Sequence, residues 1–171
     1  MRPLAPDEKS VPVVVYTQNM FVRGEIVMME NLRASLWIRS QTVLKYVHLL
    51  NANVLVFEGQ QPKSLTYSEM FVPMNDVIAY HLVPPAQEAM EFDTSELNRA
   101  MHILDIVLGA FTLKGKIRIS TQSDLATNLE VSHAGWMSVY DADISSMYLP
   151  QFSMHVPMLL INAGKVSFGI V

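Results

Sequence analysis

An all-β fold built from two similar halves is predicted by three observations. Segment 46–54 returns as segment 136–144 with aromatic, apolar, small polar, Asx-Ala-Asx and β-branched positions in the same order. Short apolar and β-branched runs, separated by polar stretches, fill both halves. A tandem duplication of a unit of about 70 residues, the size of a five-stranded small barrel, explains the pattern. Two further pairs of segments repeat in the same order, 21–26 with 112–117 and 70–74 with 154–158.

The duplication divides the chain into four parts. Pro84-Pro85 marks the boundary after the first unit, and 87–98 is the stretch with helical character, in which Ser95 is a candidate N-cap. The expected parts are a flexible arm at 1–11, a first barrel at 12–84, a connector with a short helix at 85–102 and a second barrel at 103–171.

The composition favours a folded protein that meets another protein. Half of the 171 residues are apolar, and only 16% are charged. A surface with few charges is typical of an interaction surface. The net charge of −4 gives no basic footprint for nucleic acid. The absence of cysteine excludes disulfides and thiolate sites, and no signal-peptide core or long apolar run is visible, so we expect a cytoplasmic protein without a membrane segment.

Alternation of apolar and polar positions predicts the strands of each unit. Gly24 inside a strand is expected to mark a bend or bulge. Asn51–Asn53 and Asp141–Asp143 are interpreted as tight turns rather than calcium ligands. The expected strands of the first unit are 11–16 continuing through 20–29 as one strand, then 34–40, 43–50, 54–57, 65–72 and 77–83. Those of the second unit are 103–108, 113–120, 128–131, 136–140, 144–147, 152–156 and 166–171.

Residues 71–82 are similar to the closing signature of Sm and Sm-like proteins, in which two apolar residues, Arg-Gly and two Asx-type residues precede an apolar strand. Gly24 and Gly115 resemble the glycine of the opening signature, and each is followed two positions later by isoleucine. The resemblance implies two tandem Sm-like (SH3-type) five-stranded barrels joined by a short helical connector, and ring assembly.

The RNA pocket of that family departs from its pattern here. Family members hold a uracil-like base and its phosphate with the Arg of Arg-Gly and a loop Asn. Pro73-Met74 and Pro157-Met158 stand in place of Arg-Gly, and proline carries no charge and donates no backbone hydrogen bond. We therefore expect binding through the usual pocket to be absent or weak.

An RNA- or nucleotide-binding role through another surface is the alternative. Lys114, Lys116 and Arg118 share one face of a strand, which could contact phosphate, although an ordinary solvated face is the favoured interpretation. The candidate residues for this alternative are Asn31, Ser35, Asn128, Lys114, Lys116 and Arg118.

No residue pattern for catalysis or metal binding stands out. The histidines form no H-x-H or H-x-x-x-H pair, and G-x-S-x-G, P-loop and G-x-G-x-x-G motifs do not occur. We expect no catalytic residue, metal or cofactor, and an enzyme with its site between the barrels is the weakest alternative. The histidines are His48, His81, His102, His133 and His155.

Self-association is the favoured function, as a non-enzymatic assembly or scaffold protein. Apolar edge strands with few charges are templates for pairing with another chain. Head-to-tail pairing closes a ring where the rotation fits. The resemblance to Sm-like proteins implies rings of six or seven barrels, so a chain with two barrels is expected to form a trimer with six barrels, with a dimer next. The candidate edge residues are Phe71, Val72, Pro73, Met74, Val156, Pro157, Met158 and Phe168.

Overall fold

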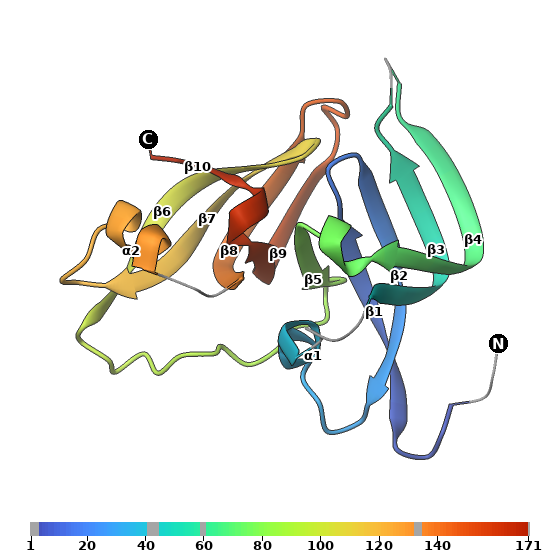
Figure 1. Cartoon of the computed structure of the whole chain (residues 1–171), viewed down its shortest axis with the longest axis horizontal. Helices are drawn as coiled ribbons and strands as arrows, with labels where there is room; N and C mark the ends of the chain where they lie inside the picture. Colours follow the sequence, from blue (N-terminus) through green and yellow to red (C-terminus); the bar gives the residue numbers. More distant parts are fainter. Residues whose placement is uncertain (1–3, 41–44, 59–60, 132–134, 171) are drawn as a thin grey trace.

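The computed structural model describes residues 4–40, 45–58, 61–131 and 135–170. The described strands pair antiparallel in one sheet, in the order β10-β6-β7-β8-β9-β5-β1-β2-β3-β4, so the all-β prediction is confirmed (Figure 1). The strands are β1 (Glu8–Tyr16), β2 (Met20–Met29), β3 (Tyr46–Val56), β4 (Lys63–Pro73), β5 (Ala79–Leu82), β6 (Arg99–Leu108), β7 (Phe111–Ser120), β8 (Trp136–Ser146), β9 (Ser153–Asn162) and β10 (Ser167–Gly169). Short helices are α1 (Ala34–Ser40), α2 (Leu125–Val131) and the 3-10 turns η1 (Met74–Asp76) and η2 (Ala163–Lys165).

The two halves of the chain have the same topology. In the first half β5 pairs with β1, and β1 to β4 follow as neighbours. In the second half β10 pairs with β6, and β6 to β9 follow in the same way. Figure 1 shows the halves side by side, joined where β5 meets β9, with β4 and β10 on opposite sides of the molecule. The sheet is open at these two strands.

The halves also share a shift in strand register, a β-bulge. Two residues of β3, Asn51 and Ala52, oppose the single residue Gly24, and the equivalent positions of β8 oppose Gly115. Asn51 and Asp141 have φ values of 50° and 53°, which Asx residues tolerate better than most. The bulge expected at Gly24 is thus present, but the two tight turns expected here are wrong. The chain continues through each as one strand, because a single left-handed Asx residue makes a bulge and not a reversal.

The strand predictions for segments 34–40 and 128–131 are wrong. These segments lie in α1 and α2, whose first residues are 91 positions apart (125 − 34 = 91). Ala34, Trp37 and Ile38 are buried at helical spacing, so the helix buries one face. In the second half the Asp124 carboxylate accepts a hydrogen bond of 2.7 Å from the backbone N–H of Thr127, as an N-cap does.

The connector between β5 and β6 contains no helix, contrary to the prediction for 87–98. Ser95 donates from its backbone N–H and its hydroxyl to the Asp93 carboxylate, at 2.8 and 2.7 Å. The predicted N-cap is therefore the third residue of an Asx turn. At the other end of the chain, β1 begins at Glu8, inside the stretch expected to be a flexible arm.

The Val-Pro-Met segments of the two halves are not equivalent, which corrects the sequence comparison. Pro73 ends β4 directly before η1, as expected for a corner. Pro157 lies in the middle of β9, and the residue before η2 is Asn162. Pro73 of β4 faces Tyr46 of β3, and Asn162 of β9 faces Trp136 of β8. Asn162 is therefore the equivalent of Pro73. Neither position carries the Arg of the Sm-like signature.

Candidate functional site: the junction and the free edges

The junction of the two halves is a short antiparallel ladder between β5 and β9. Ala79 pairs with Ile161, and Tyr80 pairs with Leu160. Next to the ladder, the backbone N–H of Asn162 donates to the carbonyl of Ile78 at 2.8 Å. All four ladder side chains are buried. The core clusters confirm the continuity, because Leu160 and Trp136 of the second half pack with the core of the first half.

A polar network fastens the first-half helix to the second half. Arg39 of α1 pairs with Glu91 at 2.9 Å and donates to the hydroxyl of Ser138 on β8 at 2.5 Å. Ser138 donates to Glu91 at 2.6 Å. Burial raises the pKa of Glu91, but hydrogen bonds from Ser138 and the charge of Arg39 outweigh it and lower the pKa below its usual value. The helix of one half is thus tied to the third strand of the other.

A second polar contact closes the other end of the junction. The ammonium group of Lys165, in η2, donates to the backbone carbonyls of Asn75 and Val77. The Gln18 amide in turn donates to the carbonyl of Lys165 at 3.3 Å. The junction is therefore held by side-chain hydrogen bonds beside its short ladder as well as by the ladder itself.

The free edge β4 carries a strip of exposed large side chains. Phe71 is 57% exposed, and Tyr46, opposite the end of β4, is 52% exposed. Leu65 and Tyr67 on the same strand are also exposed. Phe71 is stacked on His48, with ring centroids 4.3 Å apart, and His48 pairs with Glu69 at 2.9 Å. Exposed apolar and aromatic side chains along a sheet edge, here interrupted by Glu69, are typical of an interaction site.

The same positions in the second half are covered. The register makes Leu160 the equivalent of Phe71, and it is 1% exposed. The covered counterparts of Tyr46, Leu65 and Tyr67 are Trp136, Met154 and Val156. Leu160, which the internal junction buries on β9, therefore has its equivalent, Phe71, exposed to solvent on β4.

The opposite edge, β10, matches β5. Phe168 pairs with Ile106 of β6 as Tyr80 pairs with Val15 of β1, so Phe168 is the equivalent of Tyr80. Phe168 is half-buried against the core of its own half. Ser167 stands at the position of Ala79. Both strands needed for a second junction are present at the two ends of one sheet.

The predicted edge residues divide between a free edge and an inner strand. Phe71, Val72 and Pro73 lie on β4, Met74 opens η1 and Phe168 lies on β10. Val156–Met158 lie on β9, an inner strand of the sheet whose ladder with β5 is formed at Leu160 and Ile161. Sequence reasoning places Tyr67 in a candidate edge segment, 67–72, but it misses Tyr46 and Leu65, whose exposure only the structure shows.

The candidate residues for RNA binding do not form one surface. Asn31 lies in the turn after β2, and Ser35 is buried in α1 of the first half. Arg118 and Asn128 line a common cavity of about 580 Å³ in the second half. These two positions are brought together in the second half.

The predicted face of β7 carries basic residues whose charge is mostly paired. Lys114, Lys116 and Arg118 alternate with buried neighbours, so they share a face as predicted. The carboxylates of Asp141 and Glu96 lie 2.5 Å from Lys116 and Arg118 respectively.

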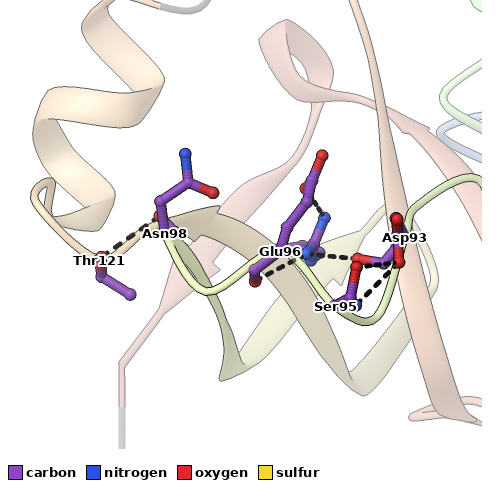
Figure 2. A network of polar contacts seen from close by, with 6 residues as sticks. Asp93, Ser95, Glu96, Asn98 and Thr121 are labelled. Atoms are coloured by element: carbon purple, nitrogen blue, oxygen red, sulfur yellow. Dashed lines mark hydrogen bonds and ion pairs between the residues drawn. The ribbon is translucent and has the colours of Figure 1, made fainter.

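The connector folds against the same face through polar contacts. Figure 2 shows Asp93, Ser95, Glu96, Asn98 and Thr121 in this network. Arg118 donates to the carbonyl of Asp93 at 2.9 Å and lies 4.6 Å from the centre of the Phe92 ring. The Thr121 hydroxyl donates to the carbonyl of Asn98 at 3.3 Å. Arg118 is thus held in place by the connector that joins the two halves.

A further group of titratable side chains extends from Lys116 and Asp141 to His155 and Asp143. His155 lies 2.9 Å from Asp143 and 3.4 Å from Asp141. Within the described ranges no group of three or more His, Asp or Glu side chains could hold a metal ion. His133 lies outside those ranges.

One histidine is buried beside the junction. Nε2 of His81 lies 3.0 Å from the Tyr16 hydroxyl, and Nδ1 lies 2.7 Å from the carbonyl of Leu82. Nδ1 therefore carries the proton, and Nε2 accepts from Tyr16. Burial lowers the pKa of His81 to about 4, although the bond to Leu82 opposes the shift.

The chain matches no family model, no curated protein and no solved structure. Within its described part, no helix has the length and apolar character needed to cross a membrane.

Proposed function

We propose that this protein is a non-enzymatic assembly protein, in which β4 of one chain pairs with β10 of the next in the way that β9 pairs with β5 inside the chain. The observation that carries the proposal is the exposed strip on β4, whose counterparts on β9 are buried or half-buried. The internal junction supplies the geometry of the contact: Phe71 faces Phe168, and Val72 faces Ser167.

Head-to-tail pairing of this kind uses two different surfaces. Each added chain leaves one β4 and one β10 free, so the series ends only when it closes into a ring. Six halves in a ring correspond to three chains, and we propose the trimer, with a dimer as the next candidate. Each half would then be one divergent Sm-like barrel, with residues 12–84 and 103–171 as the repeated units.

The proposal agrees with the chemistry of the described residues. The basic face of β7 is largely neutralised by Asp141 and Glu96, which disfavours a phosphate-binding role for that strand. By contrast, the features that the two halves share are the ladder registers and the bulges that shape the edges. Assembly is therefore the function that the arrangement supports best.

An engineered disulfide tests the proposal directly, because the natural chain has no cysteine. Directly opposed residues of an antiparallel pair have Cα atoms about 4.5–5.5 Å apart, within the range of a disulfide. The double variant Phe71→Cys/Phe168→Cys should form covalent chains between molecules under mild oxidation. The control Phe71→Cys/Ile103→Cys keeps one edge cysteine and moves the other to an exposed position of β6. Equal cross-linking of the two variants would contradict the proposal.

A further inference from the structure

A helix also crosses the internal junction, and its equivalent is unpartnered at the end of the chain. Arg39 of α1 reaches from the first half to Ser138 of β8. By the 91-residue spacing of the helices, Glu130 of α2 stands where Arg39 stands. By the register of β3 and β8, His48 stands where Ser138 stands. Glu130 and His48 are both exposed.

We infer that α2 of one chain docks on β3 of the next chain, with the Glu130 carboxylate facing His48 and Lys45. This inference rests on the proposed pairing of β4 with β10, and it names the side chains that select the partner. The occupant is a second copy of this chain, because the docking surface continues the edge that the internal junction defines.

The sizes of the two pairs are complementary. At the internal junction a long side chain, Arg39, meets a short one, Ser138. At the contact between chains a shorter side chain, Glu130, would meet a longer one, His48. The distance between helix and strand therefore stays the same. The longer side chain of the pair now comes from the strand and the shorter one from the helix.

The charges are also complementary. His48, Lys45, Tyr46, Phe71 and Trp37 are among the residues that line a cavity of about 460 Å³ beside β3. His48 already faces one carboxylate, Glu69, at 2.9 Å. The exposed ammonium group of Lys45 lies beside them, and no ion pair of Lys45 is found among the described residues. Glu8 lines the same cavity, and its carboxylate accepts a hydrogen bond from the backbone N–H of Ala5. The ammonium group of Lys45 is the cation that Glu130 would meet, and it supplies the attraction.

The contact between chains has fewer hydrogen bonds than the internal one. Pro73 stands where Asn162 donates its backbone N–H, and proline cannot donate. Asp76 stands where Lys165 donates to two carbonyls, and a carboxylate cannot donate either. Assembly should therefore be reversible and depend on protein concentration, and a charged contact at its rim should change the measured dissociation constant.

Charge reversal with rescue tests the docking, measured as the dissociation constant for assembly by sedimentation velocity at low salt. An exposed charge pair strengthens a contact only modestly, whereas like charges in contact weaken it. We expect Glu130→Lys and Lys45→Glu each to raise the dissociation constant roughly 3- to 10-fold. The double variant Glu130→Lys/Lys45→Glu should return it to near the natural value. The matched control is Glu58→Lys, an exposed carboxylate beyond the far end of β3.

The outcomes separate this inference from the proposal on which it rests. A natural chain that stays monomeric overturns both the edge pairing and the docking. Assembly that depends on Phe71 but is unchanged by Glu130→Lys, or is weakened by it without rescue, keeps the edge pairing and overturns the docking of α2. Rescue by the double variant, with no effect of Glu58→Lys, supports the docking.

Discussion

Tyr80 on β5 lies directly opposite Leu160 on β9, and the two side chains are only 2% and 1% exposed. The equivalent residues at the ends of the sheet are Phe168 and Phe71, and in the part of the chain that the structure describes no strand lies across from them. One chain therefore contains the junction between β5 and β9. At the two ends of its sheet it also carries β10 and β4, which are equivalent to these two strands. The stability of each half depends on groups beside this junction, whereas assembly is expected to depend on β4 and β10.

The buried pair Tyr16–His81 should make stability depend on pH. The pKa of His81 is lowered from 6.5 to about 4, so the unfolded chain binds more protons than the folded chain between these values. Its contribution is complete above about pH 6.5 and is lost as the pH falls to about 4, which amounts to at most about 3 kcal/mol. Urea unfolding at pH 7, 5.5 and 4 measures this loss.

The variant His81→Gln isolates the effect from that of the carboxylates. Glutamine can still donate to Leu82 and accept from Tyr16, but it does not titrate. The loss of stability between pH 6.5 and 4 should therefore be smaller in the variant. An identical pH profile for the two proteins would show that His81 is not the group responsible.

Gly115 should not tolerate a side chain. A Cβ added there would lie 2.5 Å from Cγ1 of Val139 on the neighbouring strand, because the bulge brings the two strands close together. We expect Gly115→Ala to lower the free energy of unfolding by about 1–3 kcal/mol, as overpacking does. The control Gly164→Ala places its Cβ 3.7 Å from the nearest atom and should have little effect in the same thermal or urea unfolding measurement.

Glu88 should stabilise α1 from the connector. Its carboxylate accepts hydrogen bonds from the backbone N–H groups of Ala34 and Ser35, in the first turn of the helix, where no backbone acceptor exists. Glu88→Gln replaces a charged acceptor by a neutral one and should cost about 1 kcal/mol. Unfolding of Glu30→Gln, which changes an exposed carboxylate, provides the comparison. Equal stabilities of the two variants would argue against a capping role.

The sequence predicts most of the strands because their side chains alternate, and it predicts the duplication because the segments around Tyr46 and Trp136 are similar. It does not predict α1, because Leu36 and Ile38 also fit a strand, and only the burial of Trp37 and Ile38 together shows the helical face. The bulges at Asn51 and Asp141 escape prediction for a related reason, since Asx residues favour turns and bulges alike.

The candidate interface is predicted only in part. Phe71 and Phe168 can be chosen from the sequence as apolar residues of final strands. The Val-Pro-Met similarity wrongly makes Pro157 the equivalent of Pro73, because a short motif can recur at positions that the strand register does not match. Tyr46 and Glu130 become visible only when the structure shows which equivalent residues cross the internal junction.

The molar mass in solution tests the central claim most directly. Light scattering on the natural chain at tens of micromolar should give about 58 kDa, three times the 19.2 kDa of one chain, and the mass should fall on dilution. Phe71→Asp should give a folded monomer, because it places a charge on the exposed strip without entering the core. The control Leu97→Asp, at an exposed apolar residue of the connector, should keep the natural mass. A natural chain that scatters as a 19.2 kDa monomer over this concentration range would contradict assembly through β4 and β10.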